Sequence, residues 1–400
     1  MRTDETVLSL GSQIVRLSCL IALFSCARST DPTPPSSTVN ADLLNQVIEN
    51  HASGVYQSWV NVHEAAQTLD EAIQVFVNAP SEETLSVAKE AWIAGRILYG
   101  PTEVFRFQGG PIDGPDGPEG LINAWPLDEA YIDYSVDVPT SGIIQDVVSW
   151  GEITPELLVE LNERDGEENI ATGWHAIEFL LWGQDLDPDG PGARPHTDYL
   201  VDGGTDNADR RAAYLQITSA LLVAHLAPLV EAWEPERTDN YRATFVADPE
   251  VALASILTGM GMLAGDELAG ERITVAWETF DQEDEQSCFS DTTHLDIIGN
   301  ASGIQQAWTG TLGGTEGPGP VDWLEAHDPD TATEMESALH QMMTAVEAIP
   351  VPFDSAIRAT DEGPQNNNAV EMAIRALEHQ AQITIQSAEA LGLRINLEGG

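Results

Sequence analysis

Apolar residues recur at three- and four-residue steps along most of the chain, which is the spacing of one face of an α-helix. The first clear run consists of Val55, Trp59, Val62, Ala66, Leu69, Ile73 and Phe76. Pro80-Ser81 should end this helix and cap a second one that continues to Tyr99. Further helical patterns cover residues 207–233, 249–279, 291–311, 331–349 and 367–392. Alternating strand patterns are scarce.

Residues 100–150 interrupt the helical pattern. The Gly- and Pro-rich segment 109–118 cannot form a helix, and a long irregular loop inside a globular chain is usually functional or mobile. A short helix is then expected from near Asn169 to Gly183. We therefore predict an all-α protein of two helical bundles, residues 41–240 and 241–400, with the irregular loop in the first bundle.

The N-terminus has the pattern of an export signal. A short apolar stretch follows Arg16 and ends in Leu23-Phe24-Ser25-Cys26, which is typical of a bacterial lipoprotein signal. We predict that residues 1–26 form this signal, that Cys26 carries lipid, and that the Pro-rich residues 27–40 form a tether. The expected location is the periplasm or the outer membrane, with the lipid bilayer as a partner. No run of 18 apolar residues exists, so no transmembrane helix is expected.

Charge and cysteine content narrow the possible functions. The chain has 16 Lys and Arg against 66 Asp and Glu, a formal net charge of −50. Nucleic acid phosphates repel such a surface, so nucleic acid is not an expected partner. If Cys19 leaves with the signal and Cys26 is lipidated, only Cys288 remains, and no intrachain disulfide can form.

The most informative candidate site lies in residues 173–183, which are apolar on nearly all sides and therefore predict a buried helix. His175 and Glu178 lie one turn apart on the remaining face. A buried carboxylate is costly unless it is paired or binds a metal. Two interpretations are equally supported by these residues: a metal site in a helical bundle, or a hydrogen-bonded pair that locks helices together.

Known zinc-peptidase motifs are incomplete here. The motif His-Glu-x-x-His begins at His63-Glu64, but Gln67 stands at the position of the second His. The inverted motif His-x-x-Glu-His fails because Phe179 follows Glu178.

Two further acidic segments carry candidate ligands. Ser290 is expected to cap a helix that carries Asp291 and His294, again a carboxylate and an imidazole three residues apart, with a capping and packing role as the alternative. Residues 185–190 match the first half of a calcium loop. The twelfth position is His196 instead of the required Glu, which favours an ordinary turn-rich loop.

The segment Gly173-Trp174-His175-Ala176-Ile177-Glu178 matches the Gly-x-His-x-x-Glu motif of imelysin-like proteins, and the chain resembles this family from about Tyr56 to near its C-terminus. Other segments that look like family motifs are 110–113, 125–127, 132–134, 194–199 and 283–294. The family includes iron-regulated envelope proteins and an outer-membrane protein described as an insulin-cleaving metallopeptidase. The resemblance implies an exported protein of two helical bundles, a site where they meet, and a link to iron.

The resemblance also adds three acidic residues to the candidate site. Glu103 looks like a family acidic position that faces the site, and Asp113 and Asp133 are carried over with it. The alternative for each is a loop carboxylate that accepts hydrogen bonds from backbone amides.

We therefore predict that the protein binds a transition metal, with iron favoured and zinc as the other candidate, for uptake or handling at the cell envelope. Other envelope components of iron uptake are candidate partners. The predicted ligands are His175, Glu178, Glu103, Asp133, Asp113, Asp291 and His294. Such nitrogen and oxygen ligands suit iron, zinc or manganese better than copper(I). The alternatives are a zinc metallopeptidase with Glu178 as general base and a protein that binds haem or another ligand.

Overall fold

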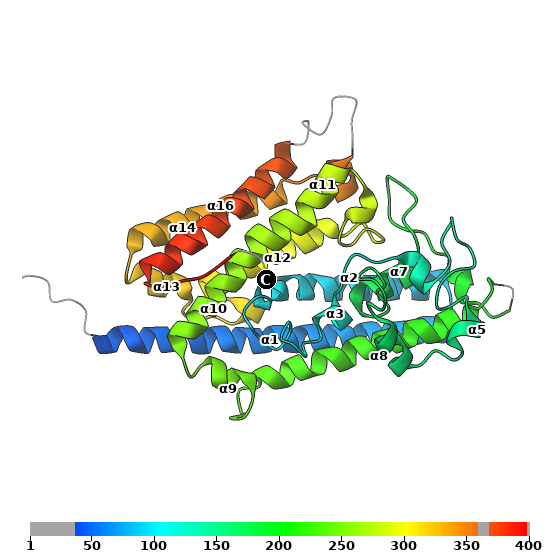
Figure 1. Cartoon of the computed structure of the whole chain (residues 1–400), viewed down its shortest axis with the longest axis horizontal. Helices are drawn as coiled ribbons and strands as arrows, with labels where there is room; N and C mark the ends of the chain where they lie inside the picture. Colours follow the sequence, from blue (N-terminus) through cyan, green and yellow to red (C-terminus); the bar gives the residue numbers. More distant parts are fainter. Residues whose placement is uncertain (1–36, 203, 359–367, 398–400) are drawn as a thin grey trace, which may run out of the picture.

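The computed structural model describes residues 37–202, 204–358 and 368–397, and within these ranges all regular elements are helical (Figure 1). The prediction of an all-α fold is confirmed. The predicted signal, most of the tether and Cys26 lie outside the described residues. The first helix begins at Ser37, inside the segment predicted as a tether.

One group of helices contains the first half of the chain. Its members are α1 (Ser37–Asn78), α2 (Glu82–Tyr99), α7 (Gly173–Trp182) and α8 (Ala208–Trp233). Helices α1 and α8 are antiparallel neighbours. Ser219 donates a hydrogen bond to Asp70 and Gln216 donates one to Gln74, so positions that increase along α1 face positions that decrease along α8. The seven apolar positions of α1 that the spacing singled out are each at most 1% exposed, so this face was correctly predicted.

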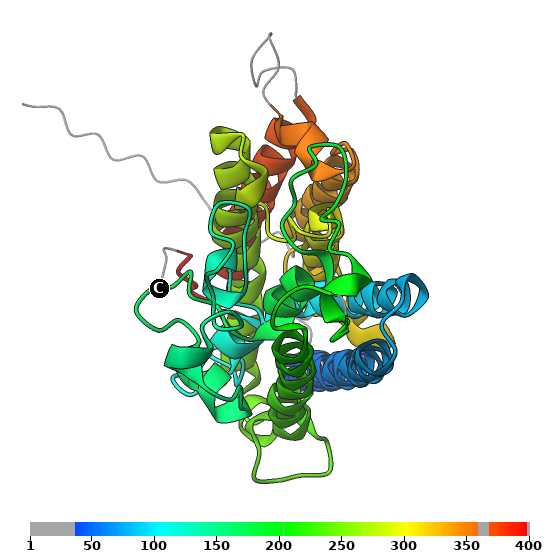
Figure 2. The same cartoon turned by 90° about the vertical axis from the view of Figure 1, so that its right-hand side faces the viewer.

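A second group contains the C-terminal half and lies along the first (Figures 1 and 2). A long rod of α10 (Pro249–Met262), the π-helical η3 (Leu263–Thr274) and α11 (Val275–Thr279) packs against α16. The other members are α12 (Thr293–Thr309), α13 (Pro320–Glu325), α14 (Pro329–Glu347), α15 (Phe353–Ile357) and α16 (Asn368–Ala390). Short α9 (Tyr241–Phe245) connects the groups where the sequence predicted a break. Their division into two domains stays a prediction.

Glycines allow close backbone contact between the groups. Helix α12 packs on η1 (Gly100–Phe105), the 3-10 turn that follows α2. A Cβ atom at Gly303 would lie 2.3 Å from the carbonyl oxygen of Pro101, and one at Gly299 would lie 3.2 Å from Cα of Gly100. The close contact between α12 and η1 therefore requires glycine at these positions.

The irregular region covers α7 with loops and short helices. Its short elements are α3 (Glu119–Ile122), α4 (Glu129–Ile132), α5 (Val147–Trp150), α6 (Pro155–Leu161) and the 3-10 turn η2 (His196–Tyr199). The C-terminal half adds the 3-10 turns η4 (Gln282–Asp284) and η5 (Leu312–Gly314). Cys288 is free and buried in the loop between η4 and α12.

Two helices begin later than the sequence suggested. Helix α7 begins at Gly173 instead of near Asn169, because Gly173 has a φ of +89° and its missing Cβ makes room for the carbonyl of Ile122. Helix α12 begins at Thr293, and the expected cap at Ser290 is wrong. Asp291 adopts the left-handed region with a φ of +55°, so the chain turns there instead of entering the helix.

Two stretches are long and apolar enough to cross a membrane when judged by length and composition, namely 208–233 and 249–279. The criterion of an uninterrupted apolar run had not revealed them. In their most apolar windows, 44% and 61% of the residues are buried inside the protein. Core helices satisfy the same length and hydropathy criteria, so these segments are weak evidence for a membrane span.

Candidate functional site

Helix α7 holds His175 and Glu178 in the interior, where both are fully buried. The aromatic residues of α2 fix this helix in place. Trp174 packs against Trp92 and Tyr99, and the indole N–H of Trp92 donates to the carbonyl oxygen of Trp174 at 2.9 Å. The buried helix predicted from the sequence is therefore present, with the two polar residues enclosed.

His175 and Glu178 contact each other and a loop of the C-terminal half. Nδ1 of His175 lies 3.0 Å from Oε2 of Glu178. The backbone N–H and the hydroxyl of Ser290 donate to Oε1 of Glu178 at 3.0 and 2.6 Å. Nε2 of His175 is buried and has no hydrogen-bond partner among the described residues. Sequence reasoning assigned Ser290 to a helix cap, and only its place in the 283–294 motif indicated a functional role.

Burial keeps this pair uncharged near neutral pH. It raises the pKa of Glu178 to about 8, although the bonds from Ser290 and the charge of Arg96 act in the opposite direction. Burial, assisted by Arg96 and Arg272, lowers the pKa of His175 well below its ordinary value. At neutral pH, Glu178 is therefore a protonated carboxyl group beside the neutral imidazole of His175. The pair must lose one proton before it carries a negative charge that can attract a cation.

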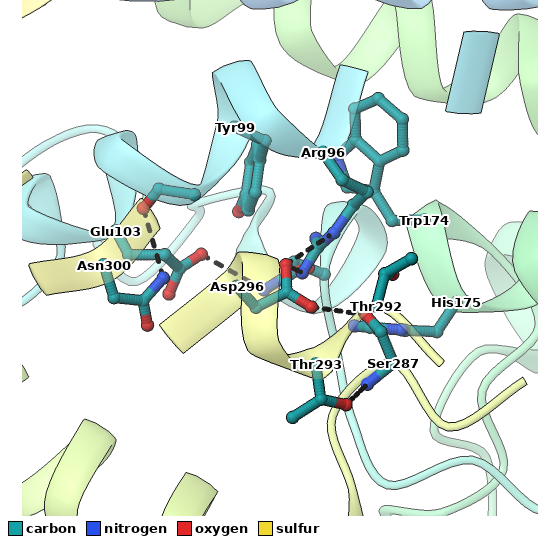
Figure 3. A network of polar contacts seen from close by, with 12 residues as sticks. Arg96, Tyr99, Glu103, Trp174, His175, Ser287, Thr292, Thr293, Asp296 and Asn300 are labelled. Carbon is teal, nitrogen blue, oxygen red and sulfur yellow. Dashed lines mark hydrogen bonds and ion pairs between the residues drawn. The ribbon is translucent and has the colours of Figure 1, made fainter. Parts of the chain in front are cut away.

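A buried polar network lies beside the pair and joins the two helix groups (Figure 3). Arg96 of α2 binds Asp296 of α12 at 2.7 Å and also donates to the side chain of Asn123. Asn123 donates in turn to Glu103 at 3.1 Å, and Asp296 accepts a bond from Ser287. The network therefore holds the turn after α2 against the start of α12.

Glu103 lies in this network as the partner of arginines. Its Oε2 accepts from Arg272 at 2.6 Å and from Arg106 at 3.4 Å. Burial alone would raise the pKa of Glu103, but Arg272 and then Arg106 lower it to about 2. The carboxylate is ionised and pairs with two arginines, both of which also pair with Glu267.

A cleft of about 420 Å³ lies between the two helix groups, and Asn123 and Arg272 of this network line it. Its lining is strongly charged and includes Arg106, Glu119, Glu267, Glu271 and Arg272. Trp125 also lines the cleft, and its ring lies 5.1 Å from the ring of His175. Trp125 thus connects the cleft to the buried pair.

The carboxylate of Asp133 pairs with arginines, and the carboxylate of Asp113 accepts a hydrogen bond from the backbone. The carboxylate of Asp133 is fully buried and accepts from Arg211 at 2.6 and 3.1 Å, and from Arg194 at 2.9 Å. Asp113 accepts from the backbone N–H of Phe107 at 2.6 Å, which is the loop role weighed as the alternative. The other oxygen of Asp113, Oδ1, is buried and has no hydrogen-bond partner within the described residues.

Asp291 lies in a cluster of aspartates that does not include His294, whose ring lies near the backbone of Asp291. Asp291 lies with Asp185 and Asp354, where burial and the neighbouring carboxylates raise its pKa to about 7. His294 is half-buried, and burial lowers its pKa. Within the described ranges, this aspartate triad is the one group with three ligand atoms within 4.8 Å of one another, so no third acid or imidazole joins His175 and Glu178 at that spacing. The metal role of the seven residues stays a prediction.

The raised pKa of Glu178 predicts a pH dependence of stability. Glu178 releases its proton near its ordinary pKa of 4.5 in the unfolded chain but near 8 in the folded one. Its contribution to stability is therefore complete below pH 4.5 and is lost as the pH rises through 8. We expect Glu178→Gln to flatten the decline of Tm between pH 6 and 8.5 in metal-free buffer, and the exposed Glu389→Gln to leave it unchanged. If Tm declined equally with pH in the wild type and in Glu178→Gln, the raised pKa of Glu178 would be contradicted.

The fold and this pair define a class of all-α proteins that bury a Gly-x-His-x-x-Glu segment where two groups of helices meet. The family model described as imelysin, peptidase M75, matches residues 55–384, so the chain belongs to the imelysin family. Iron-regulated protein A of Synechococcus elongatus is 23% identical over 362 residues, which are 87% of this chain and 86% of that protein.

Solved structures of similar fold agree with this assignment. A structure described as an iron-regulated protein A precursor from Parabacteroides distasonis has a TM-score of 0.67 at 16% identity, covering 89% of this chain and 96% of that one. An imelysin-like protein from Psychrobacter arcticum has a TM-score of 0.65 at 13% identity, covering 89% and 98%. At these identities the likeness concerns the fold.

Proposed function

We propose that this protein binds iron at the cell envelope for uptake or handling, and that His175 and Glu178 form the centre of the iron site. The observation that carries the proposal is Nε2 of His175. This buried nitrogen has no partner in the described part of the chain, and the other nitrogen of its ring contacts a carboxyl group. Membership of the imelysin family and the likeness to iron-regulated protein A support iron as the cargo.

The geometry gives the two residues different tasks. When the pair loses its proton, Nδ1–H of His175 can donate to Glu178, and the lone pair of Nε2 becomes available to an ion. Metal-binding histidines commonly donate their second N–H to a carboxylate, which fixes the ring and increases its basicity. Glu178 therefore acts chiefly by positioning His175, since its other oxygen is held by Ser290.

Binding fits this enclosure better than peptide hydrolysis. Both side chains are 0% exposed, and Trp125 packs against the imidazole, so a polypeptide has no path to Glu178 in this conformation. An ion is small enough to reach the pair from the charged cleft after a side-chain movement. The general-base role of Glu178 would require a much larger opening.

The first test is the metal content of the exported, purified protein by mass spectrometry. We expect about one iron ion per chain in the wild type and its loss in the His175→Ala/Glu178→Ala double variant, because the nitrogen ligand and its positioning group are removed together. The double variant Glu378→Ala/His379→Ala, which changes exposed residues of α16, should retain the metal.

Other results would redirect the proposal. Little metal in a folded wild type that takes up neither iron nor zinc on titration would mean that the pair is structural. Proteolysis by the metal-loaded protein that is lost in Glu178→Gln would instead support a metallopeptidase. A Soret band on titration with haem would support a haem-binding protein.

A further inference from the structure

A second, all-oxygen site lies apart from His175 and Glu178. Three buried carboxylates converge there from different parts of the chain: Asp185 after α7, Asp291 before α12, and Asp354 in α15. One oxygen of each lies within 4.8 Å of the others. Two oxygens that bind the same Ca²⁺ at about 2.3–2.6 Å can be at most about 5 Å apart, so each pair of these oxygens has a separation that is compatible with a shared ion.

Among the described residues, no lysine or arginine forms an ion pair with a carboxylate of this cluster. Both oxygens of Asp354 and Oδ1 of Asp291 are buried without a hydrogen-bond partner in the part of the chain that the structure describes. Arg358, four residues after Asp354, pairs instead with the exposed Asp189 at 2.9 Å. This contrasts with Asp133, whose carboxylate binds two arginines.

An independent side chain points to a ligand at the same place. Glu285 is 0% exposed, and its carboxyl group lies beside that of Asp354 and near the hydroxyl of Thr293. Within the described residues, neither of its oxygens accepts a hydrogen bond of good geometry. Burying a fourth carboxyl group next to three others, with no basic residue beside it among the described residues, is costly unless a cation or protons compensate it.

We propose that Asp185, Asp291 and Asp354, assisted by Glu285, bind a hard divalent cation of the calcium class. The donor set contains oxygen alone, which suits calcium and disfavours the softer transition metals that imidazole attracts. The calcium-like start of the 185–190 loop thus contributes Asp185, while the remaining carboxylates come from the other half of the chain instead of the twelfth loop position.

Such an ion would brace the neighbouring pair. It links the segment that follows α7 to the loop that precedes α12 and to α15. Asp291 directly follows Ser290, whose N–H and hydroxyl bind Glu178. The cation would therefore fix the loop that holds Glu178, and it does so whether or not His175 binds iron.

The test uses the full purified chain, stripped with EGTA and titrated with calcium chloride by calorimetry and thermal unfolding. We expect about one Ca²⁺ per chain and a Tm that rises with calcium concentration, with Mg²⁺ binding more weakly because it demands tighter octahedral geometry. Asp354→Asn should lower the calcium affinity at least about tenfold, because ligand charge sets affinity in such sites. Asp185→Asn should do the same, which keeps the test valid if one variant fails to fold.

Matched variants separate this site from the iron site. Asp189→Asn changes an exposed acid of the same loop and should bind calcium as the wild type does. The His175→Ala/Glu178→Ala variant should retain its calcium response, because it leaves all four carboxylates of this site unchanged. A folded wild type without any calcium response, or equal calcium affinity in wild type, Asp185→Asn and Asp354→Asn, would overturn the proposal, since the carboxyl groups would then be neutralised by protons.

Discussion

Replacing Asp133 with alanine should lower the free energy of unfolding by about 3–5 kcal/mol, the range measured when one partner of a buried ion pair is removed. The carboxylate is fully buried and contacts Arg211, also fully buried, and Arg194, which is 6% exposed. Without Asp133, Arg211 loses its acidic partner, and Arg194 keeps the more distant Asp198 at 3.4 Å. Urea unfolding followed by tryptophan fluorescence measures the difference.

The matched control is Asp239→Ala. Asp239 binds Arg237 at 3.2 Å, but both side chains are largely exposed to water, so this variant should unfold like the wild type. Metal content gives a second readout. Asp133→Asn should contain as much metal per folded chain as the wild type, whereas loss of metal with unchanged stability would show that Asp133 is the ligand the sequence suggested.

Replacing Gly303 with alanine should destabilise the contact between the two helix groups. The added Cβ would lie 2.3 Å from the carbonyl oxygen of Pro101 and 2.9 Å from its Cα, and these are backbone atoms that no side-chain rotation can move. Helix α12 must therefore shift away from η1. Overpacking of this kind typically costs about 1–3 kcal/mol, and thermal unfolding should show a correspondingly lower Tm.

Gly166→Ala is the control for Gly303→Ala. Gly166 is exposed, and the nearest atom to an added Cβ lies 3.4 Å away, which is an ordinary contact. Because η1 carries Glu103 and α12 carries Asp296, the shift in Gly303→Ala should also weaken the network beside His175. Unchanged stability in Gly303→Ala would show that the crossing can relax without cost.

Local patterns were sufficient for the helices and for the enclosure of the candidate pair. The apolar period of α1 identified seven core positions, and the apolar circumference of residues 173–183 predicted that His175 and Glu178 would be enclosed. Both follow from the 3.6-residue repeat, which acts between residues a few positions apart.

The start of α12 shows where local patterns failed. Ser290 precedes an acidic helical segment and therefore has the pattern of a helix cap. Its hydroxyl instead binds Glu178, 112 residues earlier in the chain. A buried carboxyl group in need of donors is a stronger partner than a helix end that begins three residues later at Thr293.

The roles of the acidic residues near the candidate site depend on the tertiary structure and could not be predicted from the sequence. By itself, the sequence determined the helices, the buried His175–Glu178 segment and the family. It could not distinguish Glu103, Asp133 and Asp291, because each is a carboxylate in an irregular segment. Arg272 reaches Glu103 from 169 positions away and Arg211 reaches Asp133 from 78, whereas the carboxylate of Asp291 lies beside those of Asp185 and Asp354. The chemistry of a carboxylate depends on the charges around it, and folding brings those charges from parts of the chain that local periodicity does not connect.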